Sequence, residues 1–212
     1  MDIHQTEEQQ VEAIKKFWNE NGNSIIAGLV IGFSAWIGYG LYQENKLEQE
    51  FAVSDSYQSV VKLAADDKEK YRQAGENFIK ENAESSYSAL TALSLAKDAA
   101  ESKDWSQVEK YLTTAIAKAT DNGIKSIATV RLARVQIELE QYEAALTTLS
   151  ATLPESFTAI VEETKGDAYL KQGKVSQART AYQAALAVEG QSSNQNLQMK
   201  LDDLAENITL DK

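Results

Sequence analysis

Residues 166–186 read GDAYLKQGKVSQARTAYQAAL, a stretch with two apolar patterns of helical spacing separated at Gly173. Small or aromatic side chains recur at regular intervals in it, at Gly166, Tyr169, Ala178, Tyr182 and Ala185. Apolar residues that return every three to four positions predict amphipathic helices, and a glycine between two such patterns predicts a turn. The stretch therefore predicts a helical hairpin in which small residues let the two helices touch.

The same pattern occurs twice more upstream. Aligned on their first helices, the three copies place Trp105, Tyr142 and Val175 at equivalent positions, at intervals of 37 and 33 residues. A helix-turn-helix unit repeated about every 34 residues is the tetratricopeptide pattern. Such hairpins stack into a solenoid, because each one buries its apolar face only against its neighbours. The sequence predicts three of them over residues 87–192, in an all-α fold.

Amphipathic stretches flank the three copies on both sides. Residues 43–86 contain two of them, with Asp66 and Asp67 placed to cap the second, and predict a first helical hairpin. Residues 193–212 carry apolar side chains at helical spacing: Leu197, Met199, Leu201, Leu204, Ala205 and Ile208. A solenoid needs a last element that covers its open apolar edge. We therefore expect a C-terminal capping helix in this stretch.

Residues 24–42, SIIAGLVIGFSAWIGYGLY, contain no charged side chain. As a helix, this run is long enough to cross the hydrocarbon core of a bilayer. The sequence thus predicts a single transmembrane helix, preceded by an acidic tail over residues 1–23. A cleavable signal peptide is the alternative, since Gly38 and Gly40 offer small residues to a peptidase, but the apolar run exceeds the usual 7 to 15 residues and the tail is acidic.

The transmembrane run also has features that set its orientation and its packing. Lys15 and Lys16 precede it closely, whereas only Lys46 follows it closely. Basic residues favour the cytoplasmic side, so we expect a cytoplasmic N terminus and a C-terminal domain outside the cytoplasm. Small residues on one helical face allow another helix to approach. Such a face is predicted at Gly28, Gly32 and Ala35.

Composition removes several classes of function. The net charge is −11, and no cluster of Lys and Arg is present to bind nucleic acid. The chain has no Cys, and its one histidine, His4, lies in the tail. The repeats therefore lack the residues of a Ser-His-Asp triad and of nearly all zinc sites, and no glycine-rich phosphate loop occurs. We predict no enzyme, catalytic residue, cofactor or metal; an enzyme of unfamiliar type is the alternative.

Candidate binding residues follow from the architecture of the repeats. The first helix of each hairpin normally faces the concave surface of the solenoid, which here selects residues 89–100, 129–138 and 164–171. Arg131 and Arg134 are the paired bases in these stretches, three residues apart on one helical face. Together with Tyr169 they are the predicted partner-binding residues.

Six segments connect the chain to a known family: QVEAIKKFWNENG in the tail, the Gly-rich apolar run, RLARVQIELEQYEAAL, AIVEETKGDAYLKQGK, ARTAYQAAL and LQMKLDDL. With these segments the whole chain resembles the YfgM family, bacterial tetratricopeptide proteins described as ancillary subunits of the SecYEG translocon. The resemblance implies a single-pass inner-membrane protein with a cytoplasmic N terminus and a periplasmic repeat domain. It also implies a link between SecYEG and the periplasmic chaperone PpiD, and help in transferring secreted proteins to periplasmic chaperones. A stress-response regulatory scaffold that acts through the cytoplasmic tail is the alternative.

Overall fold

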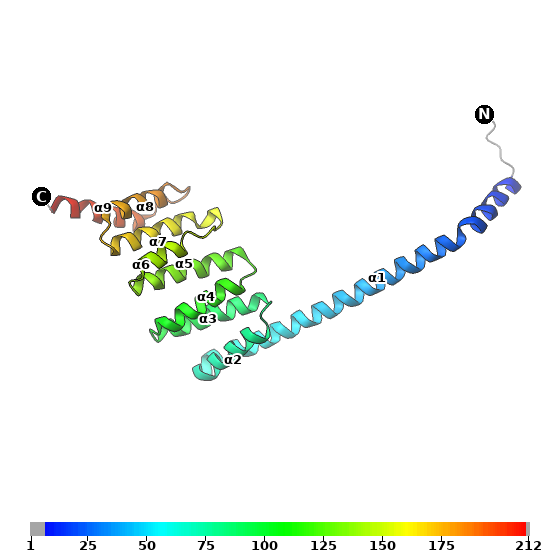
Figure 1. The fold of residues 1–212 in the computed structure, drawn as a ribbon, viewed down its shortest axis with the longest axis horizontal. Helices are drawn as coiled ribbons and strands as arrows, with labels where there is room; N and C mark the ends of the chain where they lie inside the picture. Colours follow the sequence, from blue (N-terminus) through cyan, green and yellow to red (C-terminus); the bar gives the residue numbers. More distant parts are fainter. Residues whose placement is uncertain (1–6, 211–212) are drawn as a thin grey trace, which may run out of the picture. The chain divides into compact units, whose positions relative to one another are not determined.

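The computed structural model describes the backbone of residues 7–210 and the side chains of residues 9–65 and 67–204 (Figure 1). Its regular elements within residues 7–210 are all helices, which confirms the predicted all-α class. The predictions made for the side chains of His4, Asp66, Ala205 and Ile208 lie outside the described residues. The chain divides into two compact units, residues 1–52 and 53–212.

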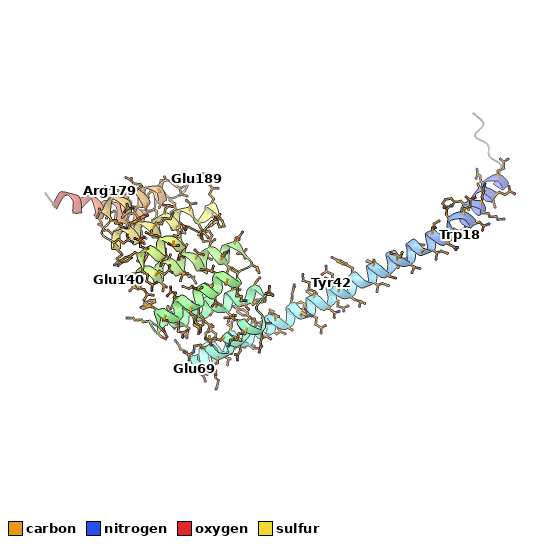
Figure 2. All side chains as sticks on the ribbon, in the orientation of Figure 1. Trp18, Tyr42, Glu69, Glu140, Arg179 and Glu189 are labelled. Atoms are coloured by element: carbon orange, nitrogen blue, oxygen red, sulfur yellow. The ribbon has the colours of Figure 1, made fainter. Side chains whose placement is uncertain are left out.

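The first unit is built on one helix. It contains α1 (Glu7–Asp66) up to Ala52, and the second unit contains the rest of this helix. Part of α1 is long and apolar enough to cross a membrane, and no side chain of its most apolar stretch is buried. Figure 2 shows Trp18 and Tyr42 protruding from the helix on either side of this stretch. Apolar side chains exposed over this length fit a lipid surrounding better than water.

The second unit continues with helices that stack in chain order (Figure 1). Three antiparallel pairs, α3 with α4, α5 with α6 and α7 with α8, form its body, and α2 and α9 lie at its two ends. Their bounds are α2 (Lys68–Glu81), α3 (Ser86–Glu101), α4 (Trp105–Lys118), α5 (Asn122–Glu138), α6 (Tyr142–Thr148), α7 (Thr158–Lys171), α8 (Val175–Ala187) and α9 (Gln195–Leu210), with a short 3-10 helix, η1 (Glu155–Phe157), before α7.

Side-chain caps fix where several helices begin. Asp67, Ser85, Asp104 and Asp121 precede α2, α3, α4 and α5, and each accepts a hydrogen bond from a backbone N–H in the first turn. Such a cap satisfies one of the donors that a helix leaves unpaired at its N terminus. The prediction that Asp67 caps the second helix is confirmed.

The turns inside the three hairpins share one geometry. Each contains a residue with positive φ two positions before the second helix: Lys103 (55°), Glu140 (60°) and Gly173 (73°). The backbone N–H of the following residue donates back into the first helix in all three turns, Asp104 to Ala99 (3.0 Å), Gln141 to Gln136 (2.7 Å) and Lys174 to Tyr169 (2.9 Å). This pattern is that of a Schellman turn. The predicted repeat is thus present in the backbone.

The C-terminal helix covers the end of the stack. Leu197 and Leu204 of α9 are each 1% exposed and pack with Tyr182 and Ala185 of α8. Met199 was expected on the same stripe but is 62% exposed. The reason is geometric, because two residues advance about 200° around a helix, so Met199 points away from the face that carries Leu197.

Candidate functional site

A hollow of about 390 Å³ lies between α5, α7 and α9. We call it the inner groove. Its lining consists of Arg134, Ile137, Glu163, Asp167, Leu170, Lys171 and Lys200. Most of these residues come from the first helices of the second and third hairpins, which are the helices expected to face the concave surface. The groove therefore lies where the repeat architecture places a binding surface.

The structure separates the three predicted binding residues. Arg131 and Arg134 are both exposed on α5, and neither forms a hydrogen bond or ion pair with the side chains and backbone of the described part of the chain. Arg134 lines the inner groove together with Lys171 and Lys200. Tyr169 does not line it; its side chain is half-buried and packs against the apolar cluster around Tyr182. Tyr169 thus contributes to the core.

One wall of the inner groove is a three-residue charge cluster. Glu163 and Asp167 lie four residues apart on α7, and Lys200 of α9 places its Nζ 2.8 Å from Glu163 Oε1 and 2.8 and 3.0 Å from the two Asp167 oxygens. Burial by itself would lower the pKa of Lys200, but its hydrogen bonds to Asp167 and Glu163 outweigh this and raise the pKa above the ordinary value. The ammonium therefore stays charged and ties α9 to α7.

Sequence reasoning missed this cluster. Glu163 and Asp167 are four residues apart, a spacing that puts both on one helical face, but neither is among the predicted binding residues. The partner cation lies 33 residues beyond Asp167. Nothing in the local pattern indicates this partner, since neither of the two lysines of residues 193–212 is marked by its neighbours in the sequence.

Tyr182 connects this cluster to the core. Its hydroxyl donates a 2.7 Å hydrogen bond to Asp167 Oδ1. Burial of the ring, and then the hydrogen bond to the Asp167 carboxylate, raise the pKa of Tyr182 far above its ordinary value. The phenol thus remains a neutral donor. Lys200 thus donates to both carboxylates of the groove wall, and Asp167 accepts a further hydrogen bond from Tyr182.

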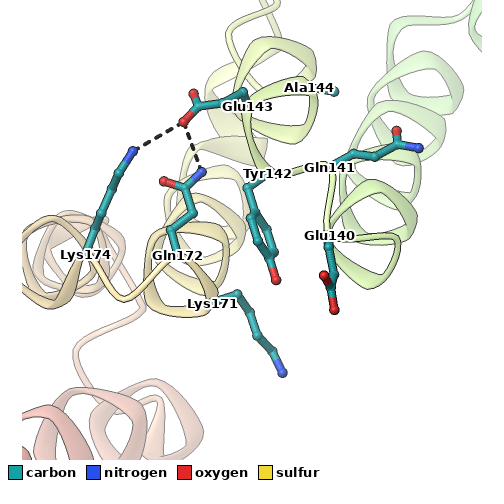
Figure 3. A pocket seen from close by; sticks show the side chains of 8 residues that line it. All are labelled: Glu140, Gln141, Tyr142, Glu143, Ala144, Lys171, Gln172 and Lys174. Atoms are coloured by element: carbon teal, nitrogen blue, oxygen red, sulfur yellow. Dashed lines mark hydrogen bonds and ion pairs between the residues drawn. The ribbon is translucent and has the colours of Figure 1, made fainter.

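A second hollow, of about 590 Å³, adjoins the inner groove. It lies between the turns of the second and third hairpins (Figure 3). On one side Glu143 accepts hydrogen bonds from Gln172 (3.2 Å) and Lys174 (3.3 Å). On the other side Tyr142 and Lys171 point the same way. Lys171 lines both hollows, so they meet at this side chain.

The described side chains offer no metal site. Among them, no group of three or more His, Cys, Asp or Glu residues could hold a metal ion. The residues lining the two hollows supply charge, apolar surface and hydrogen-bond donors, which are the means of binding a polypeptide.

The small residues of the apolar run are accessible in the first unit. A Cβ added at Gly28 or Gly32 would meet nothing within 4 Å, and Ala35 is exposed. The same holds for added Cβ atoms at Gly38 and Gly40. The face formed by Gly28, Gly32 and Ala35 is thus open to another helix, and its role in packing stays a prediction.

Comparison with known proteins places the chain in a family. A family model described as a tetratricopeptide repeat-like domain matches residues 15–206. Solved structures of MamA from Desulfovibrio magneticus RS-1, beginning at its residue 41, and of a MamA RS-1 double mutant have TM-scores of 0.51 and 0.51. Both are 14% identical in sequence to this chain. The alignment with the first covers 74% of this chain and 92% of that structure, and the alignment with the double mutant covers 72% and 96%. This likeness concerns the fold alone.

Relatives with known names match over nearly the full length. A protein of Escherichia coli K12 named ancillary SecYEG translocon subunit is 32% identical over 97% of this chain and 100% of its own length. Proteins of the same name from Haemophilus influenzae and Neisseria gonorrhoeae are 30% and 28% identical, over 93% and 96% of this chain and 97% and 100% of their own lengths. The chain therefore belongs to the tetratricopeptide repeat-like family whose members include the proteins named ancillary SecYEG translocon subunits.

Proposed function

We propose that this chain is a membrane-anchored interaction protein that associates with the SecYEG translocon of the bacterial inner membrane. The observation that carries the proposal is the combination, in one chain, of an exposed apolar helix of membrane-spanning length and a repeat domain with an open inner groove. The names of the relatives identify the translocon as the associated complex. Anchoring confines the repeat domain to the membrane and so raises its effective concentration beside a membrane partner.

The proposed topology places the tail in the cytoplasm and the repeat domain in the periplasm. Lys15 and Lys16 before the apolar run, against Lys46 after it, support this orientation. A reporter fused after Lys212 tests it. A reporter enzyme that works only in the periplasm should be active when fused at this position. A reporter enzyme that works only in the cytoplasm should be inactive at the same position. The reverse result would overturn both the orientation and the role of the repeat domain outside the cytoplasm.

The proposed partner of the repeat domain is a PpiD-like periplasmic chaperone, to which the protein helps pass secreted chains. The resemblance to the YfgM family supports this choice. We assign the contact to Arg131 and Arg134, because both are exposed on α5 without a hydrogen bond or ion pair among the described residues, and Arg134 lines the inner groove. The mechanism is tethering, in which no covalent bond is made or broken.

Charge reversal tests this contact in the full-length chain. Arg131→Glu with Arg134→Glu should reduce co-purification of the chaperone while leaving the protein in the membrane. A matched control is Lys62→Glu with Lys80→Glu, since these lysines are also exposed but lie on α1 and α2. Equal chaperone recovery with both double variants would refute the assignment of the contact to α5.

The cytoplasmic tail supports a second candidate role, as the docking segment of a regulatory scaffold. Four large apolar side chains of α1 before the membrane run are exposed: Val11, Ile14, Phe17 and Trp18. Deleting residues 2–20 separates the two roles. A scaffold acting through the tail would lose its regulatory effect, whereas chaperone recovery through the repeat domain would persist.

A further inference from the structure

The repeat register brings cations of successive hairpins onto one face of the second unit. With the intervals of 37 and 33 residues, Lys97 of α3 and Arg134 of α5 occupy equivalent positions, and Asp167 of α7, neutralised by Lys200, takes the third. The first helices contact one another, α3 with α5 and α5 with α7. Equivalent residues on adjoining parallel helices lie side by side, so this face carries a row of charges across the stack.

Most of the cations on this face have no partner, and most of its carboxylates do. Lys97, Arg131, Arg134 and Lys171 are exposed and form no hydrogen bond or ion pair among residues 9–65 and 67–204. Among the acids, Glu101 is bound by Lys68, and Glu163 and Asp167 are bound by Lys200. Two exposed carboxylates are exceptions among the described residues: Glu138, one turn after Arg134, and Glu140, in the turn that follows α5, form no hydrogen bond or ion pair through their side chains. The face thus presents four exposed cations without an ion-pair partner among the described residues, on a chain whose net charge is −11.

An apolar row runs beside the cations. One turn further along each first helix stand Ala100, Ile137 and Leu170, and the last two line the inner groove. Leu170 is 38% exposed although it lies among charged residues. A cavity of about 390 Å³ with this floor accommodates apolar side chains, while the cations around it attract carboxylates.

We propose that the inner face of α3, α5 and α7 binds an extended, acidic peptide segment of a protein partner, with carboxylates on Lys97, Arg134 and Lys171 and apolar side chains on Ile137 and Leu170. This inference rests on the proposed function and specifies the chemistry of the partner. Two helix spacings of 8–10 Å separate α3 from α7, about 20 Å in all. An extended chain spans that distance in about six residues. The recognised segment is therefore a hexapeptide core with three acids, one at each end and one between them, and apolar residues at the other three positions.

A peptide-binding measurement on the full-length chain in detergent tests the inference. The probe is a fluorescein-labelled decapeptide with the core Glu-Leu-Asp-Leu-Ile-Glu, followed by fluorescence anisotropy. We expect saturable binding that weakens as salt rises, because carboxylate–cation contacts are screened. A version with Lys at the three acidic positions, and one with Ser at the three apolar positions, should each bind at least tenfold more weakly. No binding by the parent peptide, or equal binding by the lysine version, would overturn the inference.

Two kinds of variant guard against misfolding as an explanation. Arg134→Ala with Lys171→Ala should weaken binding of the parent peptide at least tenfold, whereas Lys62→Ala with Lys80→Ala should leave it unchanged. Glu138→Gln should strengthen binding about threefold, because it removes an unpaired carboxylate one turn from Arg134 in the described part of the chain. A damaged fold cannot produce that gain. Unchanged affinity in both Glu138→Gln and the Arg134–Lys171 variant would contradict the proposed site.

The remaining comparisons separate this inference from the proposed function and from other anions. Phosphatidylglycerol vesicles are the test for a lipid site. If they displace the peptide from the protein, and bind the protein equally well when no peptide is present, the face binds lipid and the inference is wrong. If the wild-type protein co-purifies with SecYEG but does not bind the peptide, the inference is wrong and the proposed function stands. Peptide binding without SecYEG co-purification would overturn the translocon association and leave the inference standing.

Discussion

The ring of Tyr182 in α8 lies directly against the backbone of Gly166 in α7. A Cβ atom placed on Gly166 would come within 2.3 Å of Tyr182 Cε1 and 2.4 Å of Cδ1. Tyr182 is fully buried, and its hydroxyl is held by Asp167, so the ring has no free direction in which to move. The closest approach of the two helices of the third hairpin therefore depends on the absence of a side chain at residue 166.

Gly166→Ala should destabilise the repeat domain. In an exposed helix the change would be stabilising by about 1 kcal/mol, but here the added methyl forces Tyr182 or the helices apart, at about 1–3 kcal/mol of overpacking. We expect a net loss of about 1 kcal/mol in the free energy of unfolding, the difference between these two contributions. Urea denaturation of the protein in detergent, followed by far-ultraviolet circular dichroism, measures it.

A double-mutant cycle identifies the cause. In a Tyr182→Ala background the ring is gone, so Gly166→Ala should no longer be destabilising. If Gly166→Ala lowers stability equally in both backgrounds, contact with Tyr182 is not the reason that residue 166 is glycine.

The hairpin turns provide a stabilising prediction. Lys103 and Glu140 adopt the left-handed conformation that Gly173 adopts in the third copy. This conformation costs a residue with a Cβ about 1–2 kcal/mol. Glycine avoids that cost, but it loses more conformational entropy on folding, which cancels part of the gain. Lys103→Gly and Glu140→Gly should each raise the free energy of unfolding, by about 0.5–1 kcal/mol, and with it the urea midpoint. Lys103→Ala is the control, because it removes the long side chain but keeps the Cβ, and it should not raise the midpoint.

Much of this fold could be predicted from local pattern. Trp105, Tyr142 and Val175, aligned by repeat spacing, each prove to be the first residue of a second helix. Spacing succeeds because the three hairpins share one turn geometry, which starts each second helix two residues after the residue with positive φ. It failed at Met199, where apolar character suggested burial but the angle around α9 from Leu197 points it to solvent.

The candidate site could be predicted only in part. The exposure of Arg131 and Arg134 follows from their positions on α5, because Leu132, Ala133 and Val135 between and beside them are buried. The fate of Tyr169 does not follow, since a tyrosine suits a core and a binding surface equally and only its packing against the cluster around Tyr182 decides. The Lys200 cluster joins two helices through contacts that no repeat spacing encodes.

Lys200→Met should destabilise the attachment of α9. The Lys200 side chain is 34% exposed, so solvent screening limits its contribution, and we expect a loss of about 1 kcal/mol. The folded pKa of Lys200 is raised above its ordinary 10.5. Its contribution is therefore complete below pH 10.5 and disappears as the pH rises through the folded pKa. Unfolding measured across this range should show the two proteins converging at alkaline pH.

Lys174→Met is the matched control for that experiment. Lys174 pairs with Glu143, a carboxylate that is 79% exposed, and such a surface pair contributes little. Its variant should unfold close to the wild type at all these pH values. A constant difference between wild type and Lys200→Met above pH 10.5 would argue that Lys200 acts through its aliphatic chain and not through its charge.

Glu76 provides the opposite pH dependence. Hydrogen bonds from Lys110 (3.0 Å) and Tyr111 (2.8 Å) lower the pKa of Glu76. A depressed carboxyl pKa contributes stability above the ordinary value, here 4.5, and loses it as the pH falls through the folded pKa. Glu76→Gln should thus be less stable than wild type at neutral pH, by about 0.5 kcal/mol since the pair is partly exposed, and equal to it in acid. Glu84→Gln, at an exposed carboxylate, should match wild type throughout, and a Glu76→Gln deficit that persists in acid would exclude the charge as its cause.

The apolar run of α1 yields a prediction about lateral packing. Gly28→Leu with Gly32→Leu fills the open face formed with Ala35, and should prevent another helix from approaching closely. Insertion should be unaffected, because leucine favours the bilayer more than glycine.

A photocrosslinker at Ile31, which borders this face, measures the lateral contact. It should give fewer crosslinks to SecYEG in the Gly28→Leu, Gly32→Leu variant than in the wild type. Gly40→Leu is the control, since this glycine is equally open but lies about 120° around the helix from Gly28. If both variants reduce crosslinking equally, bulk in the helix matters and not this face; if neither does, the helix contributes anchoring alone and the contact with the translocon lies elsewhere in the chain.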